Sequence, residues 1–250
     1  MAPLPVQRVT PGKRPFNSVG VDYLGPVEVT VGRRKEKRWV AVSTCLAVRA
    51  VHLEVVHSLS TQSCLMALSR FASRYGKPAE IFSDNATCFR GAQNDIVRTT
   101  SQISKECAEK IISPITAWHF IPPGTPHIGG VWERMVRSVK GAMKALDDGK
   151  KLTDEILQTT IANAADMINT RPLTYKPQDP AGEEALTPNH FIRGTATDAD
   201  LQVEPVSPAE ALRNIYKRTQ YLSDRMWERW ITSTCPRSIS AANGLTIGSS

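Results

Sequence analysis

The stretch NSVGVDYLGPVEVTV, residues 17–31, decides the fold that we expect. Its β-branched residues alternate along the chain, which is typical of a β-strand. The basic segment GRRKEKR, residues 32–38, follows it and reads as an exposed turn. WVAVSTCLAV and RAVHLEVV, residues 39–48 and 49–56, predict two more strands. Three consecutive strands joined by short turns indicate an antiparallel meander.

Helices and short strands alternate after this meander. Ser60 is a candidate N-cap for a helix that Gly76 ends, and Pro172 ends a later helix that begins at Thr153. The remaining predicted elements are strands over residues 79–84 and 115–121, a polar helix over about 93–110 and a helix over 131–146. This order predicts an α/β architecture, in which helices cover a mixed sheet.

Composition divides the rest of the chain. Residues 1–15 contain four prolines and predict an extended linker, which leaves a core over residues 16–175. Residues 176–207 are rich in Pro, Asp, Glu and Thr and predict a second linker. Residues 208–231 predict a helical extension that carries aromatic side chains. Residues 232–250 have no periodicity, and we expect a disordered tail there.

The overall charge favours a polyanionic partner. The chain of 250 residues has a net charge of +7, which favours nucleic acid first and an acidic membrane surface second. Its five cysteines are scattered and form no CxxC pair, so they indicate neither a disulfide framework nor a cysteine zinc site. Reduced thiols in an intracellular protein are the simplest interpretation. The N-terminus lacks the apolar run of a signal peptide, and no apolar stretch is long enough to span a membrane.

Three acids are candidates for chemistry. Asp22 lies within an apolar strand, Asp84 ends the strand at 79–84, and Glu133 lies near the start of a helix. Each also has a structural explanation: a solvent-facing strand residue, a turn residue and an acid favoured by the helix dipole. One edge of a sheet could bring all three together. Divalent cations with oxygen ligands, such as Mg²⁺, would then remove the repulsion between the carboxylates.

The segment PPGTPHIGGVWERMVRSVK, residues 122–140, predicts a glycine-rich loop followed by a basic helix. Arg137 and Lys140 lie four and seven residues after Glu133, so the three share a helix face, with Arg134 at its margin. This face could set a metal ligand beside two phosphate-binding cations. The alternative is a solvated basic helix with an ion pair at i, i+4. His127, in the loop, is a candidate DNA contact or a turn residue.

Several segments together resemble the integrases of retroviruses and long-terminal-repeat retrotransposons. VGVDYLGP, FSDNATCF and WHFIPPGTPHIGGVWERMVRSVK are similar to the three acidic motifs of the integrase catalytic core. MAPLPxxR, KRWVAVSTCLAVRAVHLEVVHSLST and HIGGVWERMV resemble integrases of the BEL/Pao group of transposable elements. The resemblance covers residues 1 to about 230. It implies an RNase H-like fold, with a mixed five-stranded sheet flanked by helices and a C-terminal helical extension.

The resemblance also implies a function. Asp22, Asp84 and Glu133 would form a catalytic DDE triad that holds two Mg²⁺ or Mn²⁺ ions for phosphoryl transfer at DNA. The reactions would be 3′-end processing and strand transfer, which together achieve DNA integration in the nucleus. Its partners would be the DNA of the element ends, target DNA and further copies of this chain. The predicted DNA-binding residues are Asn85, His127, Arg134, Arg137 and Lys140.

The chain departs from the family pattern, and other functions stay open. Ala86 replaces a common glycine and Cys88 another common residue after the second acid, which could strain the loop near Asp84. The paired His and Cys of an upstream zinc-binding domain are missing, so we expect a fragment. The alternatives are an inactive nucleic-acid-binding remnant, an RNase H-type nuclease and a hydrolase that uses paired carboxylates without metal.

Overall fold

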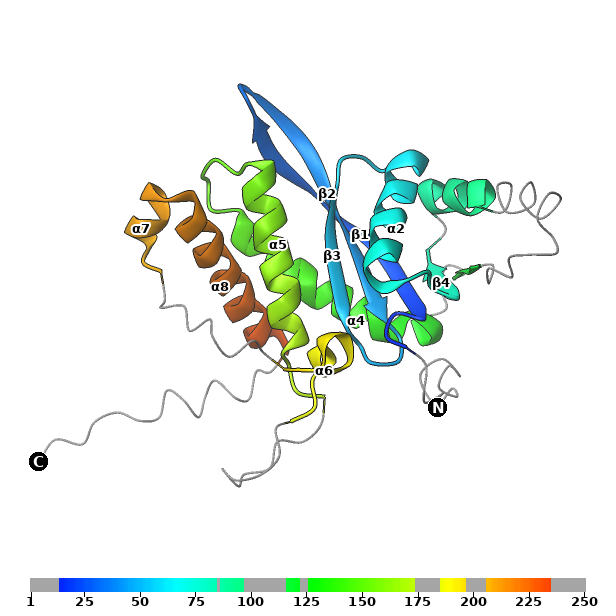
Figure 1. The fold of residues 1–250 in the computed structure, drawn as a ribbon. Helices are drawn as coiled ribbons and strands as arrows, with labels where there is room; N and C mark the ends of the chain where they lie inside the picture. Colours follow the sequence, from blue (N-terminus) through cyan, green and yellow to red (C-terminus); the bar gives the residue numbers. More distant parts are fainter. Residues whose placement is uncertain are drawn as a thin grey trace, which may run out of the picture.

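A five-stranded sheet in the order β3-β2-β1-β4-β5 forms the centre of the protein (Figure 1). Its strands are β1 (Ser18–Val31), β2 (Arg34–Cys45), β3 (Val51–Val56), β4 (Glu80–Ser83) and β5 (Ala117–Phe120). The computed structural model describes residues 14–84, 86–96, 116–121, 126–173, 185–196 and 206–234. Strands β1, β2 and β3 pair antiparallel, whereas β4 lies parallel to β1 and to β5. The predicted mixed five-stranded sheet flanked by helices is therefore confirmed.

The first two strands extend well beyond the rest of the sheet as a hairpin. β1 and β2 pair from Val19 opposite Cys45 to Val31 opposite Arg34. Most of GRRKEKR therefore belongs to β2, and the prediction that all of residues 32–38 form a turn is wrong. Side chains 34–37 are exposed, so they show no apolar alternation that could reveal a strand. Gly32, whose φ is 61°, supplies the left-handed backbone that the short turn needs.

Helices cover both faces of the sheet (Figure 1). Helix α2 (Thr61–Tyr75) and a helix over residues 87–96 pack on one face, which we call the α2 face. Helices α4 (Pro126–Met143), α5 (Asp154–Asn169) and α8 (Ile215–Thr234) pack on the other, the α4 face. The cap predicted for α2 is present, because the Ser60 side chain accepts a hydrogen bond from a backbone N–H group of the first turn. Thr153 caps α5 in the same way.

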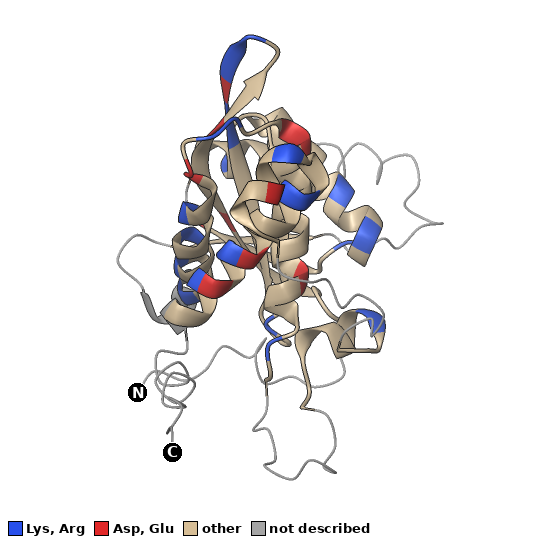
Figure 2. Cartoon of the chain, turned by 90° about the vertical axis from the view of Figure 1, so that its left-hand side faces the viewer, with Lys and Arg blue, Asp and Glu red and all other residues tan. Residues whose placement is uncertain are grey.

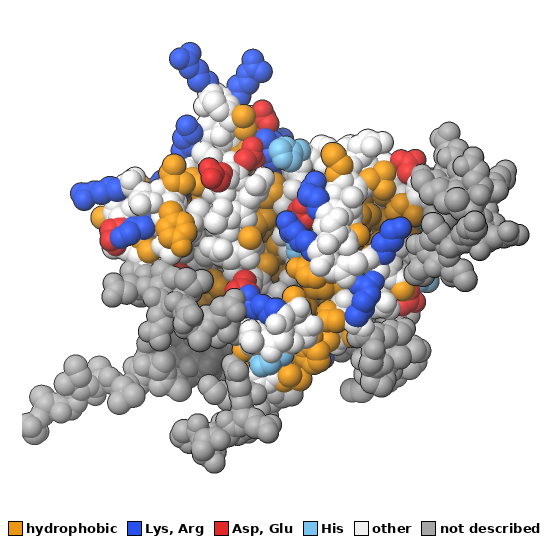
Figure 3. All heavy atoms as spheres, in the orientation of Figure 1, with side chains coloured by type: hydrophobic (Ala, Val, Ile, Leu, Met, Phe, Trp, Pro, Cys, Tyr) orange, Lys and Arg blue, Asp and Glu red, His pale blue; other side chains and the backbone are white. Residues whose placement is uncertain are grey.

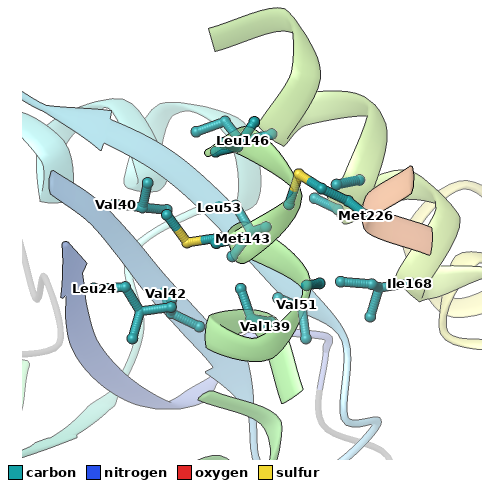
Figure 4. Packing of buried hydrophobic residues seen from close by; sticks show 14 of the residues in the cluster. Leu24, Val40, Val42, Val51, Leu53, Val139, Met143, Leu146, Ile168 and Met226 are labelled. Carbon is teal, nitrogen blue, oxygen red and sulfur yellow. The ribbon is translucent and has the colours of Figure 1, made fainter. Parts of the chain in front are cut away.

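The larger core lies between the sheet and the helices of the α4 face. Val40 and Val42 of β2 belong to this cluster together with Val139 of α4 and Met226 of α8, and all four are buried. Figure 4 shows the α4 side chains Val139 and Met143 between the strands and the neighbouring helices. This apolar packing fixes α4 against the middle of the sheet.

The basic helix begins earlier than the sequence predicts. α4 starts at Pro126 rather than Val131, so residues 127–130 are helical and do not form a loop. Proline is favoured at the start of a helix, which accounts for Pro126 as the first residue of α4. Prolines and glycines in one segment are typical of a loop, so composition alone does not predict that residues 127–130 are helical. Glu133 consequently lies well inside α4. The polar helix predicted over about 93–110 is described as helical over 87–96, and residues 97–115 lie outside the described part.

Part of the predicted second linker is folded. Helix α6 (Pro188–Arg193) lies within residues 176–207, which corrects the linker prediction there. It is held to α5 because Asn189 donates a hydrogen bond to Asp166 at 3.1 Å and Arg193 forms an ion pair with Asp166 at 2.9 Å. Proline at the helix start supports this short element, although proline-rich composition suggested a linker. The segments at 1–13 and 235–250 lie outside the described residues.

The predicted helical extension packs onto the core. It consists of α7 (Pro208–Arg213) and α8, which are separated at Asn214, a residue in extended conformation. α8 contributes Leu222, Met226 and Trp230 to the core shared with α4 and α5. Within the described residues no helix has the length and hydropathy needed to cross a membrane.

The β3 edge of the sheet is capped by a side chain. The Asn169 amide of α5 donates to the Val51 carbonyl at 2.8 Å and accepts from the Val51 N–H at 2.8 Å. A neighbouring strand would make the same pair of bonds. Asn169 is buried, so the amide satisfies two backbone groups that would otherwise lie unpaired at the protein surface.

Candidate active site

Asp22 lies in the middle of the central strand, on the face that α4 covers. Its antiparallel partner is Val42, which belongs to the core between the sheet and α4. Side chains directly opposite each other in a sheet extend on the same face, so Asp22 shares this face with Val42. The carboxylate is half-buried, and its Oδ1 accepts a hydrogen bond from the Tyr23 N–H at 2.7 Å. The alternative of a fully solvent-facing strand acid is therefore not what the structure has.

Asp84 directly follows β4, the strand that lies parallel to β1. Gly20 of β1 pairs with Phe82 of β4 in parallel register, and the two acids each follow two residues later. Adjacent strands lie about 4.8 Å apart, and side chains two residues apart share a face. The pairing of Gly20 with Phe82 therefore brings the two acid-bearing segments next to each other. Asp84 is exposed just past the end of β4, and its Oδ1 accepts from the Ala86 N–H at 3.1 Å, so it also serves as a turn residue.

A tryptophan joins α4 to these two strands. A Cβ added to Gly20 would stand 2.8 Å from the Trp132 ring, so the indole lies directly on the strand backbone. Trp132 is buried, and its ring centroid lies 6.2 Å from that of Phe82. Gly20 and Phe82 are the residues two positions before Asp22 and Asp84. Trp132 directly precedes Glu133, the third predicted acid. Its contacts with Gly20 and Phe82 therefore anchor this part of α4 beside the segments that carry Asp22 and Asp84.

The predicted cations lie on the solvent side of α4. Arg134, Arg137 and Lys140 are exposed, whereas Trp132 and Val136 are buried on the opposite side of the helix. This division follows from the helical period of 3.6 residues. The predicted phosphate-binding face is therefore accessible. The Glu133 and His127 side chains and all of Asn85 lie outside the described part, so their predicted roles stay predictions.

The acids present suit a hard divalent cation. Among the described side chains there is no group of three His, Cys, Asp or Glu residues that could hold a metal ion. Asp22 and Asp84 supply two carboxylates from neighbouring segments, and the third predicted ligand, Glu133, is on helix α4, which packs on the sheet. Carboxylate oxygens are the ligands that Mg²⁺ and Mn²⁺ prefer. The donor set thus fits the predicted metal chemistry.

An aromatic stack, which sequence reasoning missed, supports the two acids from the other face. The Tyr23 ring stacks on Phe89, with centroids 5.0 Å apart and planes inclined by 4°. Tyr23 follows Asp22, and Phe89 lies in the helix that follows Asp84, so the stack ties the two acid-bearing segments together. Burial is the main cause that raises the pKa of Tyr23 far above its ordinary value, so the phenol stays neutral. The available signals were Tyr23, directly after Asp22, and Phe89, five residues after Asp84.

Ala86, in the substituted motif after Asp84, adopts an ordinary backbone conformation. Within the described residues the non-glycine positions with positive φ are Phe16 and Arg49, so Ala86 does not need the backbone freedom of glycine. Cys88 is buried in the core of the α2 face, and burial is the main cause that raises its thiol pKa. Ala86 itself therefore does not show the strain that the missing glycine suggested.

Comparisons with known proteins find similar structures only. Neither a scan of known protein families nor a search of curated proteins finds a match. One similar chain is in the simian T-cell lymphotropic virus intasome bound to PP2A regulatory subunit B56 gamma, with TM-score 0.45 and 14% identity; the match covers 79% of this chain and 60% of that one. Another is the BIV integrase catalytic core, with TM-score 0.43, 15% identity and coverages of 71% and 93%. A third is the HTLV-2 integrase catalytic core with magnesium, in a trimeric form, with TM-score 0.41, 16% identity and coverages of 72% and 99%.

Proposed function

We propose that the chain is the catalytic core of an integrase that transfers phosphoryl groups at DNA. The observation that carries the proposal is the parallel pairing of Gly20 with Phe82, because Asp22 and Asp84 each follow two residues after this pair. The motif resemblance and the exposed cations of α4 add to it. The finer proposal is a BEL/Pao-type retrotransposon integrase that acts in the nucleus as a homo-oligomer, on element ends and target DNA.

The proposed division of labour follows from the elements that carry the residues. Asp22, Asp84 and Glu133 would hold two Mg²⁺ or Mn²⁺ ions. When bound, such ions activate the attacking hydroxyl and offset charge on the leaving oxygen. Arg137 and Lys140, on the exposed side of α4, would bind the DNA backbone and hold the scissile phosphate at the carboxylates. These contacts would contribute little to the recognition of a particular DNA sequence, because phosphate groups are the same at every base.

The test uses the purified chain with labelled oligonucleotides that match the element ends. In Mg²⁺ or Mn²⁺ we expect trimmed and joined DNA products, and none after chelation with EDTA. Glu133→Gln should abolish the products because the amide is a poor ligand for a hard cation. An inert wild type whose DNA binding is unaltered in Glu133→Gln would favour a binding remnant. Preferential cutting of the RNA strand of an RNA–DNA hybrid would favour an RNase H-type nuclease. Activity that survives EDTA would favour a hydrolase that needs no metal.

A further inference from the structure

A groove of about 670 Å³ runs between the second half of β1 and the turn that joins α4 to α5. We call it the lysine groove, because ammonium groups from the hairpin, from α4 and from the turn surround it. The five lysines in its lining are Lys35, Lys140, Lys144, Lys150 and Lys151. Figures 2 and 3 show Lys and Arg on the protruding hairpin above this region. Only Lys140 belongs to the residues predicted from sequence to bind DNA.

The lysine groove keeps a positive charge after its ion pairs are considered. Its lining contains two carboxylates, Glu28 and Asp147. Glu28 is paired with Lys35 at 3.1 Å, across an exposed hairpin surface. Within the part of the chain that the structure describes, no ion pair joins Lys144, Lys150 or Lys151 to an acid. These cations can therefore bind a polyanion without first breaking an internal pair.

Three interactions fix the conformation of the turn that carries Lys150 and Lys151. Asp148 forms an ion pair with Arg218 of α8 at 3.2 Å, and both side chains are about nine-tenths buried. The Lys150 N–H donates to Asp148 Oδ1 at 3.0 Å. The Leu152 carbonyl accepts from the Thr30 N–H of β1 at 2.7 Å. The backbone under the two lysines is therefore pre-organised, which lowers the entropy lost when a ligand binds.

The lysine groove starts beside the candidate active site. Its first lining residue, Leu24, follows Asp22 by two positions on the same face of β1, and the groove continues to Thr30. Six residues of a strand span roughly 20 Å. One strand of duplex DNA carries a phosphate about every 3.4 Å along the helix axis. The groove is thus long enough for about six base steps that lead away from the acids.

The lining favours a phosphate backbone over an acidic peptide. Among the apolar residues of the groove, Leu24 is 5% exposed, Val29 1% and Leu152 5%, whereas Val27 is half-buried and Pro26 is exposed. The buried residues offer no apolar anchor of the kind that dominates protein and peptide interfaces. We propose that the lysine groove binds the sugar–phosphate backbone of the DNA duplex behind the reacting end. This inference rests on the proposed function, and it assigns Lys144, Lys150 and Lys151 to the DNA.

The test measures binding of a fluorescent duplex of about 20 base pairs by the full chain in EDTA, across a salt series. The variant is Lys150→Gln with Lys151→Gln. The matched control is Arg74→Gln with Lys77→Gln, which removes the same charge at the end of α2. We expect the groove variant to bind about ten-fold more weakly and to lower the salt slope by about two, because each phosphate contact contributes about 0.9. The control should change neither value.

Equal effects in the two variants would overturn the proposal. It would also be overturned if polyglutamate displaced the fluorescent duplex as efficiently as unlabelled DNA does. A second measurement uses the wild type and does not depend on folding of the variants. DNA should protect Lys144, Lys150 and Lys151 from acetylation but leave Lys217 on α8 reactive, and unprotected groove lysines would contradict it. Since EDTA prevents metal-dependent chemistry, failure here is distinguishable from failure to form DNA products.

Discussion

Gly20 of β1 and Trp132 of α4 are in such close contact that a Cβ on the glycine would stand 2.8 Å from Cγ and Cδ2 of the indole. The absence of a side chain at Gly20 therefore sets how closely α4 approaches the sheet. Gly20 lies two residues before Asp22, and Trp132 directly precedes Glu133. The contact consequently governs the separation between the acid on the strand and the acid on the helix.

The Gly20→Ala variant should lose both stability and activity. The added methyl group overlaps a buried ring, and overpacking of this kind costs about 1–3 kcal/mol in the free energy of unfolding. A displaced α4 should also lower the rate of DNA product formation by roughly 10²-fold, because the acids separate. Urea unfolding and an oligonucleotide assay measure the two effects.

Gly141→Ala, also on α4, is the matched control because a Cβ there meets no atom within 4 Å. It should stabilise the protein by up to about 1 kcal/mol, since alanine has the higher helix propensity. Trp132→Leu combined with Gly20→Ala should cost less than the sum of the single losses, because the overlap is removed. Strict additivity would show that the two residues do not act through their contact.

Asp22→Asn and Asp84→Asn should each abolish metal-dependent product formation, with a decrease of at least roughly 10³-fold. Both substitutions keep the shape of the side chain but remove the charge that a divalent cation requires. DNA affinity in EDTA should stay within about two-fold of the wild type, because the phosphate-binding cations are untouched. The exposed Glu155→Gln, on α5, is the control and should retain full activity. An active Asp84→Asn protein would remove Asp84 from the site.

Asp154→Ala should destabilise the protein by about 1.5–3 kcal/mol, the range for hydrogen bonds to charged groups. Asp154 binds Arg38 through two hydrogen bonds, from Nε at 2.7 Å and from Nη2 at 2.9 Å, and Arg38 is buried. The substitution leaves the guanidinium with Glu36 as its remaining carboxylate partner. Lys35→Ala removes an exposed pair and should change the free energy of unfolding by less than about 1 kcal/mol. Comparable losses in the two variants would contradict this account.

The acid stability of the protein should depend on Glu54. Burial acts to raise the pKa of this carboxyl, but hydrogen bonds from His52 and Arg70 outweigh it and hold the pKa below the ordinary value of 4.5. Ionised Glu54 therefore stabilises the fold above pH 4.5, and this contribution is lost as the pH falls from 4.5 through the lower folded value.

Urea unfolding of the wild type and of Glu54→Gln measures the effect over that range. The difference in free energy between them should be constant above about pH 5.5 and shrink steadily in more acidic buffer. Glu28→Gln, in an exposed ion pair with Lys35, should show little difference at any pH. A Glu54→Gln difference that does not change with pH would contradict the assignment.

Much of the fold could be predicted because its signals are local. Apolar strands, the caps Ser60 and Thr153 and the stops Gly76 and Pro172 each depend on neighbouring residues alone. The predictions failed where an element is stabilised by tertiary contacts or is exposed to solvent, because its own residues then carry no such local signal. Residues 34–37 are exposed to solvent and pair with β1, and α6 is held by α5 although its surroundings are rich in proline.

The sequence predicts where Asp22 and Asp84 lie in the fold but not what holds their segments together. The position of Asp22 in a strand and of Asp84 at a strand end follows from the sequence. The proximity of the two segments depends on the pairing of Gly20 with Phe82, which brings together residues more than 60 positions apart. The Trp132 contact and the Tyr23–Phe89 stack are equally non-local, so no periodicity within one segment could reveal them.

The amide of Asn169 on the outer strand has a consequence for how the protein avoids aggregation. An open strand edge is a template on which further chains can add, one strand after another. Asn169 already occupies both backbone groups of Val51, so an incoming strand would have to displace a buried side chain first. One helical residue thereby blocks the addition of a further strand at Val51 on this edge of the sheet.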